Sequence, residues 1–291
     1  MIGVERLRQG LMDLWGLPEP VVERHDGGMN SSTWFVTDRG ERWVAKAVDP
    51  AARRSFTSGL AVAAALQHAG VPAGAPMATR QGERVVDVDG TPLALLTWVP
   101  GEELTSTDPG DQRLIGAVLA RVHRALAGVA VPDAERFHWV DPQSEHLDVR
   151  PWVRPAVARA VAAYDELDPQ TLSWGLLHTD PAFDAFRMDR ARGVCGMIDW
   201  STAMIGPLLY DVASAVMYAG GLDRSGALVE AYLDEGVMPR AEAERALGVM
   251  LRFRWAVQAD YFARRIVTND LTGVASAAEN EKGLADAFAW L

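Results

Sequence analysis

The chain has 291 residues, 49% of them apolar and 23% charged, which is an ordinary composition for a globular protein with room for two domains. Its formal net charge of −11 argues against non-specific nucleic-acid binding and would favour a cationic small substrate. The lone cysteine, Cys195, excludes an internal disulfide and a cysteine metal cluster.

The beginning of the chain, MIGVERLRQGLMDLWG, carries charges throughout and lacks the apolar block of a signal peptide. The longest apolar run, near residues 60–66, is far too short to cross a bilayer. We therefore expect a cytoplasmic protein with no membrane partner.

The first hundred residues have the pattern of a β-rich segment with one main helix. A short amphipathic helix over 4–15 precedes the strands, and an alanine-rich helix over 52–69 interrupts them before Pro72. Alternation and turn residues predict strands at 21–25, 34–37, 42–48, 83–88 and 91–98.

The turn after the first strand is a candidate phosphate-binding turn. Residues 26–32 read DGGMNSS, in which Gly28, Asn30 and Ser31 could contact a nucleotide. Glycine lets backbone amides approach a phosphate closely. A hairpin also needs glycine for its own turn, so a purely structural role is the alternative.

A lysine lies within the strand that follows. In WVAKAV, alternation places Val44, Lys46 and Val48 on one face, and Trp43 with the alanines on the other. Such a lysine is either a partly buried charge with a partner or an edge residue that reaches solvent. A nucleotide phosphate would be a suitable partner.

The rest of the chain has the pattern of a mainly helical segment. Val99-Pro100-Gly101 ends the strand pattern and marks the expected boundary. His123 has no second metal-type residue four positions later, so we expect a hydrogen-bonded core histidine there. Apolar periodicity predicts helices over 114–126, 152–167, 208–219, 223–235, 240–268 and 276–290.

Two aspartates follow two short apolar strands in WGLLHTDPAFDAFRMDRARGVCGMIDW, residues 174–200. Asp180 comes before Pro181, which we expect to end the first strand because proline has no amide proton. Asp199 follows the second strand. Two converging carboxylates suit a base and a metal ligand in phosphoryl transfer, and two unrelated surface aspartates are the alternative.

The order of these features resembles the aminoglycoside phosphotransferase and choline kinase-like family, a branch of the protein-kinase-like fold. The resemblance covers about residues 20–270 and is strongest at LHTD (177–180), MIDW (197–200) and GPLLYD (206–211). It implies a two-lobed α+β fold. The small antiparallel β lobe with one main helix, 1–99, would bind nucleotide. The larger, mostly helical lobe, 100–291, would hold the catalytic and metal sites and the acceptor pocket.

The resemblance implies a catalytic role for several acidic residues and their neighbours. Asp180 would be the base that accepts or orients the acceptor's hydroxyl proton, and His178 would brace its loop. Asp199 would hold Mg²⁺ across the nucleotide phosphates. Asp211 would fix the catalytic loop by hydrogen bonds.

The resemblance also implies that ATP binds to the first lobe. Lys46 would contact the α and β phosphates, and Val44 would line the adenine pocket. Backbone groups of Thr97, Trp98 and Val99 would read the purine edge.

Three positions depart from the family pattern. Ala185 stands where the family places a metal-ligating asparagine, and the neighbouring Asp184 is a candidate replacement. Gly59 stands where the family's helix offers a glutamate to the lysine. Residues 181–184 read PAFD, where the family tends to have leucine, histidine, proline and glycine.

We therefore expect an ATP-dependent O-phosphotransferase that acts on a hydroxyl group of a small molecule. The negative net charge favours a cationic acceptor, such as an aminoglycoside-like antibiotic, with Asp260 and Glu145 as candidate partners for its amines. The alternatives are a pseudokinase-like protein that binds nucleotide or antibiotic with little turnover, or a kinase for a nucleoside, macrolide, sugar or amino-alcohol.

Overall fold

The computed structural model describes residues 2–25, 31–137 and 140–291. Contacts divide the chain into two compact units. The first unit comprises Met1–Glu102, Val129–Glu135 and Arg187–Ala203, and the second comprises Glu103–Gly128, Arg136–Phe186 and Met204–Leu291. The segment that carries Asp199 thus packs with the first unit, whereas the expected boundary at Val99 assigned it to the later part of the chain.

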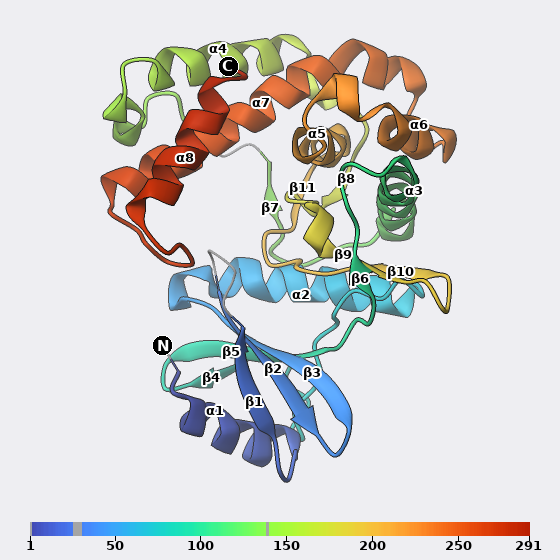
Figure 1. Cartoon of the computed structure of the whole chain (residues 1–291), viewed down its shortest axis with the longest axis vertical. Helices are drawn as coiled ribbons and strands as arrows, with labels where there is room; N and C mark the ends of the chain where they lie inside the picture. The colour runs from blue at the N-terminus through green and yellow to red at the C-terminus, as the bar shows by residue number, and fades with distance from the viewer. Residues whose placement is uncertain (1, 26–30, 138–139) are drawn as a thin grey trace. The chain divides into compact units, whose positions relative to one another are not determined.

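A five-stranded antiparallel sheet forms the centre of the first unit (Figure 1). The predicted strands are all present, although the fourth begins at Val86 instead of residue 83. In spatial order the strands are β1 (Val21–His25), β2 (Ser32–Asp38), β3 (Glu41–Ala47), β5 (Thr91–Thr97) and β4 (Val86–Val88).

The two faces of this sheet carry different kinds of side chains. One face forms a core of buried side chains that includes Trp34, Val36, Ala45 and Leu95. The register pairs Phe35 with Val44 and Lys46 with Ala94, so these side chains belong to the opposite face. The predicted alternation around Lys46 is therefore confirmed.

The N-terminal helix covers the core face of the sheet. Leu7 and Leu11 are fully buried in the same cluster as Trp34. The predicted single helix over 4–15 is instead an α-helix, α1 (Val4–Gly10), followed by one π-helical turn over Leu11–Trp15. Gly16 ends it with a φ of +78°, a conformation that glycine adopts without a Cβ clash.

The main helix of the first unit, α2 (Arg53–His68), packs through Phe56 and Leu60 against Ala94, on the face of the sheet that carries Lys46. Two small three-stranded sheets were not predicted beyond their β8 and β10 strands, because two- to four-residue strands carry too few residues for periodicity to show. They consist of β10 (Val194–Met197), β9 (Phe186–Asp189) and β6 (Glu102–Glu103), and of β7 (Glu135–Arg136), β11 (Met204–Pro207) and β8 (Trp174–Leu177).

Helices dominate the second unit, and the six predicted ones are present. The long α7 packs against α4, α5 and α8, while α3 packs against α6 (Figure 1). Asp108 caps α3 through the backbone N–H of Asp111, so this helix begins five residues before the predicted start. The bounds are α3 (Pro109–Leu126), α4 (Val153–Glu166), α5 (Leu209–Tyr218), α6 (Gly226–Asp234), α7 (Arg240–Val267) and α8 (Ala277–Phe288).

Aromatic rings fill the centre of the second unit. Phe137 contacts Tyr210 and Phe253, with ring centroids 4.6 and 5.4 Å away, and the Tyr164 ring packs on Phe253 at a tilt of 36°, with centroids 4.6 Å apart. Short 3-10 turns connect the helices and strands of both units. They are Pro50–Ala52, Glu145–Val149, Pro169–Thr171, Phe183–Ala185 and Leu222–Arg224. Within the described ranges, no helix has the length and apolarity needed to cross a membrane.

Candidate active site

Lys46 forms an ion pair with Asp199 in the first unit. The lysine is only 9% exposed, and its Nζ donates to Oδ1 of the aspartate, 153 residues later in the chain. A buried ammonium needs an anion, and the family's helix glutamate is missing here. The sequence left the partner of Lys46 open, and the structure shows that Asp199 pairs with it.

Asp199 is held in a conformation that few non-glycine residues adopt. Its φ is +70°, two residues after β10 ends at Met197. The hydroxyl of Ser201 donates to Oδ1 at 3.0 Å, and the aspartate side chain remains 54% exposed. The left-handed backbone turns the carboxylate towards the lysine while leaving it open to solvent.

Gly59, where the resemblance expects a glutamate, lies against backbone atoms that leave no room for a side chain. A Cβ at this position of α2 would lie 2.0 Å from the carbonyl oxygen of Trp200 and 3.1 Å from the Cα of Ser201. Helix α2 thus packs directly against the backbone that follows Asp199. There is no room for a glutamate stem at this position of the helix.

Replacing Gly59 by alanine should lower the free energy of unfolding by about 1–3 kcal/mol, because the new methyl group meets backbone atoms that cannot rotate away. Gly248, in α7, is the matched control, since a Cβ there meets nothing within 4 Å. Gly248→Ala should raise stability by up to about 1 kcal/mol. Urea unfolding measures both. A Gly59→Ala variant as stable as Gly248→Ala would contradict the close approach.

The loop after β8 is fixed by Asp211, which is 0% exposed. The carboxylate accepts the backbone N–H groups of His178 and Thr179, each at 2.7 Å. Strand β8 therefore ends at Leu177, three residues before the predicted end near Pro181. Thr179 has a φ of +76°, so the same contacts hold a strained turn. The expected role of Asp211 matches these hydrogen bonds.

Two buried histidines support this loop without facing solvent. His123 contacts Asp211 through Nε2 at 3.0 Å and Tyr232 through Nδ1 at 2.8 Å, which confirms a hydrogen-bonded core residue. Because a carboxylate can only accept, the ring N–H at Nε2 faces Asp211. Burial raises the pKa of Tyr232, so its phenol stays protonated. His178 is 1% exposed, and its Nδ1 accepts the backbone N–H of Asp180 at 3.3 Å.

Asp180 lies at the end of this loop with a half-exposed side chain. Its Oδ1 accepts a hydrogen bond from the Tyr218 hydroxyl and another from Nη2 of Arg254, at 3.0 Å. Burial, together with the charge of Asp180, raises the pKa of Tyr218 above its usual range, so the phenol stays protonated. An exposed carboxylate on a rigid loop can orient a hydroxyl group of a substrate.

Sequence reasoning missed three residues of this group: Ser214, Tyr218 and Arg254. The first two lie three and seven positions after Asp211, so a polar stripe in the apolar helix α5 could have identified them. Arg254 lies on α7 among several other arginines. Nothing local in the sequence distinguishes it from them.

The expected alternative metal ligand, Asp184, is exposed in the second unit, while Ala185 is buried at 5% exposure. The resemblance expects an asparagine ligand at this position, and the buried methyl group of Ala185 cannot bind a metal. Among the described residues, no three His, Cys, Asp or Glu side chains gather as a metal cluster. One or two carboxylates are nevertheless enough for Mg²⁺ when substrate phosphates and water supply the other oxygens.

Most of the expected nucleotide-binding residues belong to the first unit. Phe35 lies opposite Val44 on the lysine face of the sheet, and its ring meets Trp98 edge to face at 5.5 Å. The guanidinium of Arg42 stacks over Trp98 at 3.8 Å from the ring centroid. Ser31 directly precedes β2. The expected contacts at Gly28 and Asn30 lie outside the described residues.

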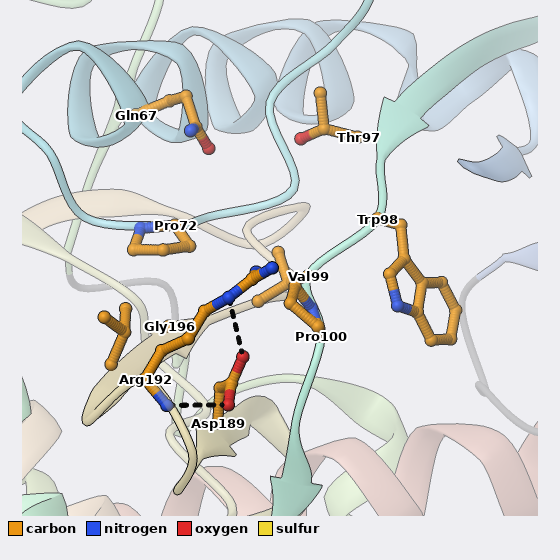
Figure 2. A pocket seen from close by; sticks show the side chains of 10 residues that line it. Gln67, Pro72, Thr97, Trp98, Val99, Pro100, Asp189, Arg192 and Gly196 are labelled. Atoms are coloured by element: carbon orange, nitrogen blue, oxygen red, sulfur yellow. Dashed lines mark hydrogen bonds and ion pairs between the residues drawn. The ribbon is translucent and has the colours of Figure 1, made fainter. Parts of the chain in front are cut away.

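A cavity of about 280 Å³ lies beside the segment from Thr97 to Pro100 (Figure 2). Figure 2 shows Trp98 directed to the opposite side of this segment from Thr97. The lining, which contains neither Val44 nor Lys46 among the described residues, also includes Gln67, Pro72, Asp189, Arg192, Val194 and Gly196. The cavity thus shares Trp98 with the lysine face, but the side chains of Val44 and Lys46 do not line it.

The two acids considered for substrate amines differ in the structure. Asp260 is buried and accepts a hydrogen bond from Nε2 of His146 at 2.7 Å. Glu145 is exposed. Asp260 is thus already engaged within the protein.

A family model described as the phosphotransferase enzyme family matches residues 21–247, a span that contains Lys46, Asp180 and Asp199. The chain belongs to this phosphotransferase family. The resemblance inferred from the motifs is thereby confirmed. As a family member the protein is an ATP-dependent phosphotransferase that uses an alcohol group as acceptor, which leaves the alternative of a binding protein without turnover unsupported.

Known relatives of this phosphotransferase have several acceptors. It is 29% identical to a homoserine kinase of Phenylobacterium zucineum over 249 residues, which cover 78% of this chain and 76% of that kinase. An amicoumacin kinase solved with AMP-PNP and Ca²⁺ has a TM-score of 0.76 at 16% identity, covering 98% of this chain and 92% of that one. A microcompartment-associated aminopropanol kinase has a TM-score of 0.72 at 18% identity, covering 99% and 95%. The predicted two-lobed α+β, protein-kinase-like fold is confirmed.

Proposed function

We propose that this phosphotransferase moves the γ-phosphate of Mg-ATP to a hydroxyl group of a small, amine-bearing molecule in the cytoplasm. The observation that carries the proposal is the Lys46–Asp199 pair, which joins a buried cation and a hard oxygen ligand on one face of the sheet. The lysine would bind the α and β phosphates, and Asp199 would hold Mg²⁺. The metal would neutralise charge on the phosphates during transfer.

Other residues would hold the two substrates in this proposal. Val44, Ser31 and the backbone at Thr97–Val99 would bind the nucleotide. Asp180 would receive the proton of the acceptor hydroxyl, and His178 would brace its loop. Asp184, exposed beside Ala185, is the candidate for a second metal contact.

An amine beside the hydroxyl is the acceptor feature that we propose. The net charge of −11 favours a cationic molecule, and exposed Glu145 is a carboxylate available to an amine. Homoserine and aminopropanol, after which two of the kinases above are named, both carry an amine and a hydroxyl group. An amine-bearing antibiotic, whose phosphorylation would give resistance, is the second candidate, favoured by the fold shared with the amicoumacin kinase.

The test is incubation of the purified chain with Mg-ATP and a panel of homoserine, aminopropanol, choline, ethanolamine, an aminoglycoside and a simple sugar. Mass spectrometry should find a phosphate added to an amine-bearing member. Phosphorylation of the sugar alone would overturn the amine requirement, and no product with any member would count against the proposed acceptor class.

The lysine provides the sharpest variant for this test, because the chain has one other lysine, Lys282, which is exposed. Lys46→Met should lower kcat/KM for ATP by roughly a hundredfold or more, as expected for loss of a cation aimed at the phosphates. Lys282→Met should change it by less than about twofold. Equal effects of the two substitutions would contradict the phosphate-binding role.

A further inference from the structure

One face of helix α5 holds the catalytic loop by a series of contacts in chain order. Asp211, Ser214 and Tyr218 are spaced three and four residues apart, so they share this face of an otherwise apolar helix. Asp211 accepts the N–H groups of His178 and Thr179, and Ser214 donates to the Thr179 carbonyl at 3.2 Å. Tyr218 then donates to the Asp180 side chain.

Arg254, from helix α7, completes this series. Its side chain is 9% exposed, its Nε donates to Ser214 at 3.0 Å, and its Nη2 donates to Asp180 at 3.0 Å. Burial acts to lower the pKa of Arg254, but the neighbouring Tyr210, Tyr218 and Asp180 raise it above its ordinary value. The guanidinium therefore stays charged, and its charge faces Asp180.

Both donors to the Asp180 side chain use the same oxygen, Oδ1. No described residue donates a hydrogen bond to Oδ2. A carboxylate whose one oxygen is held by two rigid donors cannot rotate about its last bond. Its second oxygen then points in a fixed direction.

We propose that Arg254 and Tyr218 are positioning residues that lock Oδ1 of Asp180 and present Oδ2 to the acceptor. This inference rests on the proposed role of Asp180 as the base. The acceptor oxygen forms a bond to the γ-phosphorus while the bond between that phosphorus and the β–γ bridging oxygen breaks. The bridging oxygen keeps the electron pair and leaves with ADP, and the acceptor's hydroxyl proton passes to Oδ2.

The exposure of the two partners leaves the carboxylate accessible to a substrate while the arginine stays buried. The Asp180 side chain is 53% exposed, whereas that of Arg254 is 9% exposed. Arg265, three turns further along α7, shows the structural case. Its partners are Asn280, the carbonyl of Thr272, the Tyr261 hydroxyl and Asp270, whose side chain is 39% exposed, and none is a candidate reacting group.

Arg265 therefore serves as the matched control for kinetics with Mg-ATP and the panel acceptor that wild type phosphorylates fastest. Arg254→Ala should lower kcat about a hundredfold, with KM for ATP changed by less than about threefold, since only the orientation of the base is lost. Arg254→Lys keeps the buried charge without the planar fork, and it should recover part of that loss.

Chemical rescue separates positioning from folding. Millimolar methylguanidine should raise the activity of Arg254→Ala at least about tenfold, because a free guanidinium can restore the contact with Oδ1. It should not raise the activity of wild type or of Arg265→Ala, and ammonium ions should not replace it. No rescue, or an equal loss of kcat in Arg265→Ala, would overturn the proposal.

A crystallographic comparison tests the lock without any acceptor. Wild type should show one Asp180 rotamer with Oδ1 on Arg254 and Tyr218, and the Arg254→Ala, Tyr218→Phe double variant should show several. One unchanged rotamer in the double variant would overturn the inference even if no panel acceptor is phosphorylated. Ordered Asp180 together with an inactive wild type would count against the proposed acceptor class alone.

Discussion

Exchange of Asp180 for asparagine should lower kcat for phosphoryl transfer by roughly a hundredfold to ten-thousandfold, the usual range for loss of a positioned proton acceptor. Asparagine keeps an oxygen that can accept from Tyr218 and Arg254, so the loop is retained. Alanine would instead leave the buried arginine without its carboxylate and would mix loss of chemistry with loss of stability.

The measurement is the rate of phosphorylated product formation together with the dissociation constant of ATP. The constant should change little, because Lys46 and Asp199, the proposed phosphate and metal residues, lie in the first unit and Asp180 lies in the second. Asp223→Asn is the control, an exposed aspartate in the same unit. Wild-type kcat in the Asp180→Asn variant would contradict the assignment of the base, as would an equal loss in the control.

The face of the sheet that carries Lys46 could be predicted because it depends on a local rule. Alternation over residues 43–48 assigns each side chain to a face, and the register with β2 and β5 follows it. The long helices were predictable for the same reason, since the sequence of each has a periodic apolar stripe over several turns. Such patterns lie within one segment and need no knowledge of its neighbours.

The partner of Lys46 could not be predicted in this way. Asp199 reaches the lysine from another part of the chain because α2 approaches the Trp200 backbone at Gly59. In the sequence, Gly59 stands where the resemblance expects a glutamate. The structure shows that a side chain at this position has no room. The contact between Gly59 and Trp200 joins segments that are far apart in the sequence, so no local pattern reveals it.

The hydrogen bonds from Tyr218 and Arg254 to Asp180 could not be predicted from the sequence either. The spacing of Asp211, Ser214 and Tyr218 is visible in the sequence, but what their face contacts is not. Arg254 and Arg265 lie about three turns apart on the same side of α7, and both are buried. Only the packing of α7 against α5 shows that one of them reaches the proposed base.

The catalytic loop itself should depend strongly on Asp211. Asp211→Ala should lower the free energy of unfolding by roughly 3–5 kcal/mol, because three donors then lose their acceptor and each unsatisfied buried donor costs about 1–3 kcal/mol. These donors are the N–H groups of His178 and Thr179 and the Nε2 of His123. Urea unfolding followed by circular dichroism measures the change.

Asp260→Ala is the matched control, since Asp260 is also a buried aspartate of the second unit but accepts from His146 alone among the described residues. It should cost only about 1–3 kcal/mol. A further comparison separates the loop from the rest of the unit. Asp211→Ala should release the amides of residues 178 and 179 to fast hydrogen exchange, whereas Asp260→Ala should leave them protected. If both variants lose the same stability and keep these amides protected, then Asp211 does not hold the loop, and its other contacts, which include those of Ser214, Tyr218 and Arg254, fix the position of Asp180.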